Sequence, residues 1–235
     1  MTDYQPTFAE KAIHYYNQLQ TPTGLAPGVS AMNPYADPVV QAIVAQFYTK
    51  FYADTQPRVY MLGINPGRFG AGVTGLSFTT PQNLARYCGI PNNLPPTPEL
   101  SSRFIYRVIE VFGGVEAFYG RFFLSSLYPL ALVKDGKNYN FYDDKLTTNT
   151  LWPVMIEGIR TQQTFGCDRR VAICLGRKNE GFFNKLNDEH SFFDRIVAVD
   201  HPRYILQYKS KFLEQYLDTY LQVLTDCLPD MAGRQ

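Results

Sequence analysis

Cysteine and histidine motifs of the kind that bind metals are missing from this chain. Its four cysteines include no C-x-x-C pair, and its three histidines form no paired motif. These absences argue against a zinc site and against a disulfide framework, so we expect no metal and a reducing, cytoplasmic setting. The cysteines are Cys88, Cys167, Cys174 and Cys227.

The chain also has little net charge and no long apolar run. Lys and Arg number 22 against 21 Asp and Glu, which leaves a formal net charge of +1 at pH 7. Such a chain sets up no long-range field, so any contact with nucleic acid must come from a local basic patch. Polar residues follow Met1, and no apolar run approaches membrane-spanning length. We therefore expect neither a signal peptide nor a membrane partner.

A Gly-rich loop after a predicted strand is the most informative stretch. The apolar residues 59–62 run into Gly63, Asn65 and Pro66, so the chain must leave a buried sheet abruptly. Glycines and aromatic residues continue the loop, at Gly67, Phe69, Gly70, Gly72, Gly75 and Phe78. Ligands bind at the carboxyl ends of parallel strands, where glycines let a planar group approach main-chain N–H groups.

The same loop also fits a simpler role. Its glycines could make turns and its phenylalanines could belong to the core, and the loop alone does not decide between the two interpretations. It lacks the Gly-Lys-Ser/Thr of a P-loop and the G-x-G-x-x-G spacing of a dinucleotide site. A phosphate-binding enzyme is therefore disfavoured.

Apolar and turn-forming residues alternate along the chain in the manner of an α/β protein. Strands are predicted at 59–62, within 122–133, at 170–176 and at 195–200; helices at 7–20, 38–53, 101–112, 115–119, 147–164, 177–186 and 207–227; loops at 21–38 and 80–98. This order favours a three-layer α/β/α sandwich around a central, mainly parallel four-stranded sheet. At this length we expect a single domain over 1–235.

Two polar residues interrupt the apolar run 122–133. Ser125 and Ser126 lie where the strand should end, and Pro129 excludes a central ladder position beyond them. The pair could form a pocket floor, or both could be core serines with satisfied hydroxyls, and the spacing fits the two equally. Residues 135–138 predict a turn, from which 139–142 would return as a hairpin.

Two motifs at predicted strand ends resemble those of one enzyme family. The loop Gly63-x-Asn65-Pro66-Gly67-x-Phe69-Gly70, continued by Thr74-Gly75-x-x-Phe78, resembles the first motif of the single-strand-selective monofunctional uracil-DNA glycosylases. His201-Pro202-Arg203 resembles the start of the family's second motif. The resemblance covers roughly residues 33–225, preceded by an N-terminal helix and loop at 1–32. It looks closest to a bacterial branch in which an aromatic residue follows His-Pro-Arg.

The resemblance implies a DNA-repair glycosylase that flips uracil, or a 5-substituted uracil, out of DNA and removes it by hydrolysis. Asn65 would hold the attacking water, and a neutral His201 would donate a hydrogen bond to the departing base. Neither motif contains a lysine that could form a Schiff base, which implies a monofunctional enzyme that leaves an abasic site. No metal or cofactor is implied; the partner is DNA, and a monomer without an obligate protein partner is the default.

Further site residues follow from the same resemblance. The base-binding residues would be Gly63, Ile64, Pro66, Gly67, Phe69, Phe78 and Ser126. The candidate DNA contacts are Arg68, Arg203, Tyr204, Ile205, Lys209 and Lys211. Gly67 would leave room beside position 5 of the ring.

Two departures from the family pattern keep alternatives open. Ser126 stands where the family has an Asn that reads the uracil edge, and the shorter serine could admit another deaminated base such as xanthine. Arg203-Tyr204-Ile205 replaces a Ser-Pro-Arg wedge, so the intercalating residue is not defined. A non-catalytic nucleotide- or nucleic-acid-binding protein on the same fold is the alternative of another class.

Overall fold

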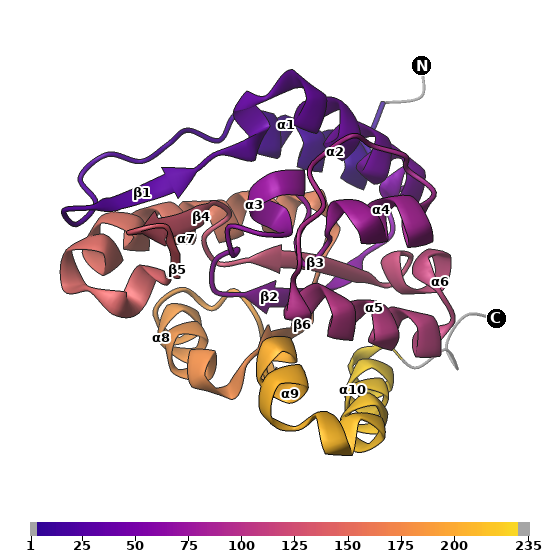
Figure 1. Ribbon diagram of the computed structural model, residues 1–235. Helices are drawn as coiled ribbons and strands as arrows, with labels where there is room; N and C mark the ends of the chain where they lie inside the picture. The colour runs from indigo at the N-terminus through magenta and orange to yellow at the C-terminus, as the bar shows by residue number, and fades with distance from the viewer. Residues whose placement is uncertain (1–3, 230–235) are drawn as a thin grey trace.

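A four-stranded parallel sheet forms the centre of the molecule. The computed structural model describes residues 4–229, so positions 1–3 and 230–235 of the predicted domain lie outside the described residues. The strands run in the order β3 (Phe122–Ser126), β2 (Arg58–Gly63), β6 (Cys167–Leu175) and β7 (Ile196–Val199). Helices cover both faces (Figure 1), which confirms the predicted α/β/α sandwich.

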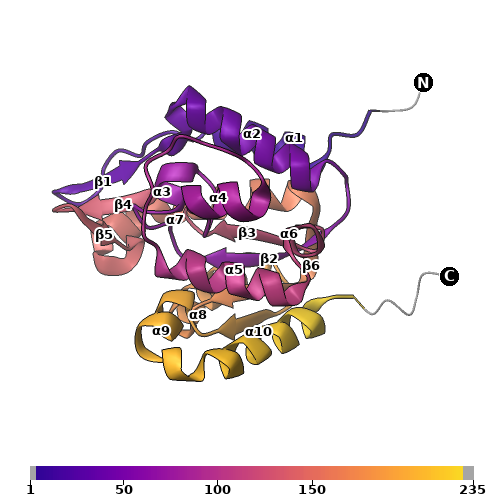
Figure 2. The ribbon, with the colours of Figure 1, turned by 45° about the vertical axis from the view of Figure 1, so that its right-hand side comes forward.

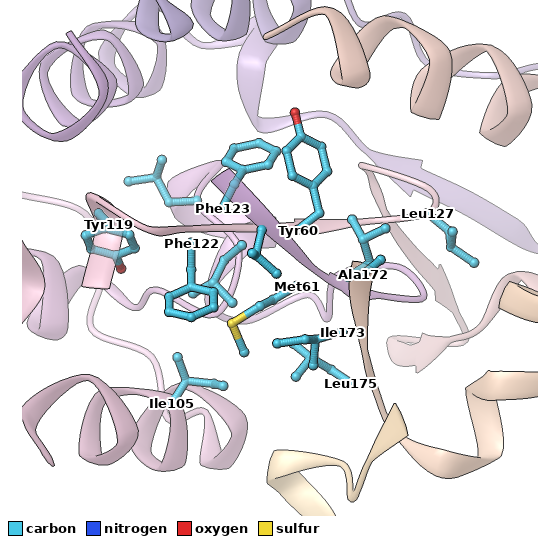
Figure 3. Packing of buried hydrophobic residues seen from close by; sticks show 14 of the residues in the cluster. Tyr60, Met61, Ile105, Tyr119, Phe122, Phe123, Leu127, Ala172, Ile173 and Leu175 are labelled. Carbon is cyan, nitrogen blue, oxygen red and sulfur yellow. The ribbon is translucent and has the colours of Figure 1, made fainter. Parts of the chain in front are cut away.

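The core is built on β2, the strand that leads into the Gly-rich loop. All of its residues are buried because β3 and β6 pair with its two edges and helices cover both faces. Successive side chains point to opposite faces, so Tyr60 reaches one helix layer and Met61 the other (Figure 3). Phe123 and Phe122 of β3 alternate in the same way. Burial of each such side chain contributes about 1.5–3 kcal/mol, which fixes the strand end that carries the loop.

The helices form a layer on each side of the sheet (Figures 1 and 2). One layer contains α1 (Phe8–Asn17), α2 (Pro38–Tyr52) and α7 (Lys145–Gly166). The other contains α5 (Leu100–Phe112), α9 (Pro202–Tyr208) and α10 (Leu213–Cys227), while α8 (Glu180–His190) packs beside β7. Thr7 begins α1 with a capping box, and Asp37 caps α2 by accepting the Val39 N–H.

Several short helices complete the chain: α3 (Ala71–Thr74), α4 (Pro81–Cys88), α6 (Val115–Tyr119) and 3-10 turns at Pro34–Ala36, Phe141–Asp143, Arg177–Asn179 and Ser210–Phe212. The prediction that 80–98 is irregular was wrong for α4. Thr80 caps this helix, Pro81 occupies its first position, and Gly89 ends it with a φ of 62°. These signals were present in the sequence, but four further prolines between residues 91 and 98 favoured the prediction of a loop.

A second, antiparallel sheet stands beside the carboxyl ends of the central strands. It consists of β1 (Val29–Met32), β4 (Ala131–Lys134) and β5 (Lys137–Tyr139). The predicted hairpin is confirmed, with Asp135 and Gly136 at positive φ in its turn. The loop predicted for 21–38 was wrong where β1 pairs with β4. The run 122–133 is likewise two strands, with Pro129 between them.

The helix predicted over 207–227 is two helices that meet at a turn. Pro202 begins α9, which ends at Tyr208, and α10 starts only at Leu213. Phe212 falls inside the predicted helix but is half exposed, because it lies in this turn. Among residues 4–229, no helix combines the length and apolarity needed to cross a bilayer.

Candidate active site

A cavity of about 880 Å³ opens at the carboxyl ends of β2 and β3. Its walls come from the loop after β2, the β4–β5 hairpin, the start of α5 and the segment that joins β7 to α9. Many of the predicted site residues line it together: Gly63, Ile64, Asn65, Pro66, Gly67, Arg68, Phe69, Phe78, Ser126, His201, Arg203 and Tyr204. The two motifs, far apart in sequence, thus meet in one cavity.

Three predicted DNA contacts do not line this cavity. The side chain of Ile205 is fully buried on the face of α9 that packs against α5, so the prediction of a DNA contact there was wrong. Lys209 is half buried and Lys211 is exposed, and both lie where α9 gives way to α10. The two lysines stay predicted phosphate contacts.

The side chain of Asn65 is fixed by the backbone of the neighbouring hairpin. Its Nδ2 donates to the carbonyl oxygens of Tyr139 at 3.0 Å and Pro66 at 3.2 Å. Its Oδ1 accepts the Phe141 N–H at 3.1 Å. Both Nδ2 protons are therefore used, whereas an amide oxygen has two lone pairs. Asn65 can accept one further hydrogen bond from a group in the cavity.

The hairpin also supports the loop beside Asn65. The Arg68 N–H donates to Asn138 Oδ1 at 2.9 Å. A Cβ added to Gly67 would lie 3.1 Å from Asn138 Nδ2, closer than ordinary contact. The space that a side chain at residue 67 would take is therefore filled by Asn138, and any room for a 5-substituent depends on this exposed amide.

Phe78 presents an aromatic ring to the cavity from a strained backbone. Its φ is 55°, a conformation that bulky residues rarely adopt and that costs about 1–3 kcal/mol. The ring lies over Gly63, where an added Cβ would be 3.3 Å from Cζ. Its centroid is 6.5 Å from that of the His201 ring. The missing side chain at Gly63 thus lets an aromatic face lie beside the catalytic candidate His201.

The two serines at the end of β3 have different environments. Ser125 donates to Gln162 Oε1 and lies 3.2 Å from the Tyr16 hydroxyl, so it belongs to the core. Ser126 lines the cavity, with its Oγ 3.7 Å from the Cβ that Gly63 lacks, and makes no side-chain hydrogen bond within the described residues. The alternation of a strand therefore divides the pair between core and pocket.

His201 caps α9 and is held in one tautomer. Its Nδ1 accepts the Arg203 N–H at 3.1 Å, so the proton of the neutral ring resides on Nε2. Burial, with a smaller contribution from the Arg203 charge, lowers the pKa of His201 to about 4. Near neutral pH the ring is a neutral hydrogen-bond donor.

Glu99 is a cavity residue that the sequence analysis missed. Its carboxyl group packs against Gly70, whose missing Cβ makes the space, and Oε2 has no hydrogen-bond partner within residues 4–229. Burial raises the pKa of Glu99 to about 8, although the positive charge of Arg203 opposes the shift. The residue stands just before a predicted helix, a position typical of caps, and no motif marks it.

Basic side chains also line the cavity: Arg68, Lys137, Arg177, Lys178 and Arg203. The Arg68 guanidinium lies 4.5 Å from the centre of the Phe69 ring, so the Phe69 ring makes a cation–π contact with Arg68. Arg177 lies 3.6 Å from Asp200 Oδ2, which offsets part of the positive charge. No group of three or more His, Cys, Asp or Glu in the described part of the chain could hold a metal ion.

Comparisons with known proteins agree with the site. The sequence profile of the uracil DNA glycosylase superfamily matches residues 49–225. The crystal structure of wild-type Pedobacter heparinus SMUG2 is 43% identical, with a TM-score of 0.90 over 94% of this chain and 98% of that chain. No curated protein matches. The chain therefore belongs to the uracil-DNA glycosylase superfamily, as its two motifs indicated.

Proposed function

We propose that this protein flips uracil out of DNA and removes it by hydrolysis, leaving an abasic site. The observation that carries the proposal is the pairing, in one cavity, of a neutral Nε2–H donor on His201 with the oriented amide of Asn65. Cleavage of a base–deoxyribose bond needs an extruded base, a stabilised leaving anion and a positioned water. The lining residues can supply all three.

The base would stack on Phe78 while the loop that follows β2 offers main-chain N–H groups to its carbonyl oxygens. Ser126, whose hydroxyl has no hydrogen-bond partner among residues 4–229, would face the polar edge of the base. A hydroxyl both donates and accepts, so it can read either a carbonyl or a ring N–H, although it reaches less far than an amide. A bridging water would complete the contact.

His201 would stabilise the leaving base. As the bond breaks, negative charge accumulates on the base and its O2 oxygen becomes a stronger acceptor. A neutral imidazole that already carries its proton on Nε2 can donate to that oxygen without first losing or gaining a proton. The low pKa keeps the ring in this form throughout the neutral pH range.

Asn65 would hold the attacking water. With both Nδ2 protons used by carbonyl oxygens, the free lone pair of Oδ1 can accept a water proton and aim the oxygen at the sugar. An amide is a poor base, but a cationic transition state needs orientation more than proton removal. Within residues 4–229, the only lysines that line the cavity are Lys137 and Lys178, and both are exposed. Neither belongs to the two motifs, so we propose hydrolysis without a Schiff base.

Ser126 favours a second candidate substrate. Because the serine is shorter than the family's asparagine, the pocket floor has more room, and a larger deaminated base such as xanthine would fit the same chemistry.

Arg68, Arg203 and Tyr204 would contact the DNA around the extruded nucleotide. We propose that the protein acts as a monomer in the cytoplasm.

Base release from single-uracil oligonucleotides tests the proposal. Wild type, Asn65→Ala and the exposed control Asn93→Ala would be incubated in EDTA with single- and double-stranded substrates, and with xanthine and hypoxanthine versions. We expect alkali-dependent cleavage by wild type and by the control, and a loss of about 10²-fold in Asn65→Ala. Borohydride trapping should give no covalent complex. Absence of release from every substrate would refute the enzymatic proposal.

A further inference from the structure

Exposed aromatic side chains gather on α9 and the turn that follows it. Among the described residues, the exposed aromatic rings are Tyr4, Tyr204, Tyr208 and Phe212. The last three lie within nine residues of sequence, with exposed fractions of 40%, 67% and 50%. Clustered exposed rings on a soluble protein commonly mark an interaction surface.

Two of the three rings share a helix face, and the third follows in the next turn. Tyr204 and Tyr208 are four residues apart on α9 and so share a helix face; their ring centroids are 5.7 Å apart. Gln207 Nε2 donates to the Tyr208 hydroxyl at 3.0 Å and helps hold that ring at the surface. Phe212 follows in the 3-10 turn.

The charge of this segment is one-sided. Residues 203–212 contain Arg203, Lys209 and Lys211 and no acidic residue, in a chain whose formal net charge is only +1. The next acid is Glu214, on α10. Rings interleaved with cations match a strand of phosphates and unpaired bases better than they match an apolar protein surface.

The exposed aromatic residues begin at the cavity, because Tyr204 is one of its lining residues. His201 caps α9, and Arg203 and Tyr204 of the same helix line the cavity, so a strand with one nucleotide inserted there would meet α9 on leaving it. Figure 2 shows α9 at the surface, at the end of the molecule towards which β2 and β3 point.

We propose that Tyr204, Tyr208 and Phe212 form a stacking platform for unpaired bases that flank the nucleotide in the cavity. The platform rests on the proposed function, because it defines the strand beyond the reacting base. Stacking on aromatic faces tolerates any base, since every base has a π-face, while Arg203, Lys209 and Lys211 hold the phosphates. Tyr208 and Phe212 add aromatic contacts to the predicted DNA contacts Lys209 and Lys211, which also lie outside the cavity.

The test separates stacking from phosphate binding by changing both protein and DNA. Dissociation constants would be measured by fluorescence anisotropy for two single-stranded uracil oligonucleotides. In one the flanking nucleotides carry bases; in the other they are tetrahydrofuran units that keep the phosphates. Tyr208→Ala should weaken binding about tenfold on the first and leave the second unchanged, whereas Tyr208→Phe should bind like wild type. Tyr4→Ala is the matched control, because Tyr4 is a similarly exposed tyrosine that precedes α1, a helix of the other layer.

Other results would overturn the platform. Equal effects of Tyr208→Ala on both oligonucleotides, or no effect on either, would show that the ring does not stack on flanking bases. Sedimentation that shows a dimer lost in Tyr208→Ala would assign the patch to a contact between copies of this chain. Base release by wild type is measured on the same oligonucleotides, so its absence would refute the proposed function while the binding comparison still tests the platform.

Discussion

The two walls of the cavity are held in contrasting ways. The loop that carries Asn65 depends on distant parts of the chain, because Tyr139 and Phe141, more than 70 residues away, fix its amide, and Asn138 holds the Arg68 N–H. The ring of His201, on the wall formed by the segment between β7 and α9, makes one side-chain hydrogen bond within the described residues, from the N–H of Arg203 two residues on. One wall is assembled by tertiary structure and the other by the local geometry of a helix N-terminus.

This difference indicates which substitutions should affect Asn65 and which should affect His201. A substitution in the β4–β5 hairpin can loosen Asn65 without touching His201, since no hydrogen bond in the described residues joins the hairpin to α9. His201, in contrast, responds to its own burial and to nearby charge. Preorganised donors account for much of the rate in such sites, so each wall should have its own kinetic signature.

Removal of the His201 side chain should have the largest effect. His201→Ala takes away the proposed donor to the departing base, and we expect the single-turnover rate constant for uracil release to fall about 10²-fold or more. Binding of an abasic oligonucleotide should change little. The exposed His14→Ala on α1 is the control and should retain wild-type rates. A fall of less than threefold in the rate constant of His201→Ala would show that His201 does not stabilise the departing base.

A hairpin substitution should have a smaller effect confined to the first wall. Asn138→Ala frees the Arg68 N–H and the space beside Gly67, so the loop that carries Asn65 becomes less ordered. We expect the rate constant to fall about tenfold with an unchanged pH profile, because misplaced groups lose much of their orientation advantage. If the rate constant of this variant depended differently on pH in the acidic range, the two walls would not be independent.

The Glu99 carboxyl should make DNA binding depend on alkaline pH. With a pKa raised to about 8, it is neutral below that pH and ionises above it. The ionised group would attract Arg203 and compete with DNA phosphate, so affinity should fall a few-fold as pH rises from 7 to 9. Glu99→Gln, which stays neutral, should lose this dependence in anisotropy titrations. The same decline in wild type and variant would exclude Glu99 as its cause.

The smallest effect is expected from Lys211. This exposed lysine lies beyond both walls, so Lys211→Ala should weaken DNA binding only a few-fold. The slope of log K against log salt should fall by about one if it contacts a phosphate. The rate constant for bound substrate should be unaffected. An unchanged salt slope would place Lys211 outside the DNA contact.

The sequence predicted the local features of this site better than the distant ones. Strand ends and Gly turns depend on neighbouring residues, so Asn65, Phe78 and His201 could each be placed in a segment that follows a predicted strand. Glu99 and Asn138 could not, because each matters only through a contact made by folding. The burial of Ile205 was missed for a related reason: without the start of α9 at Pro202, its helix face could not be assigned.

The central claim is that a neutral, Nε2-protonated His201 lines the same cavity as Asn65, the residue proposed to hold the attacking water. The most direct test is the ¹⁵N–¹H NMR spectrum of the His201 imidazole in the full chain, assigned with His201→Ala and followed from pH 4 to 8. The account predicts a neutral ring with its proton on Nε2 down to about pH 5 and titration near 4. A ring that is charged at pH 7, or one that carries its proton on Nδ1, would contradict it.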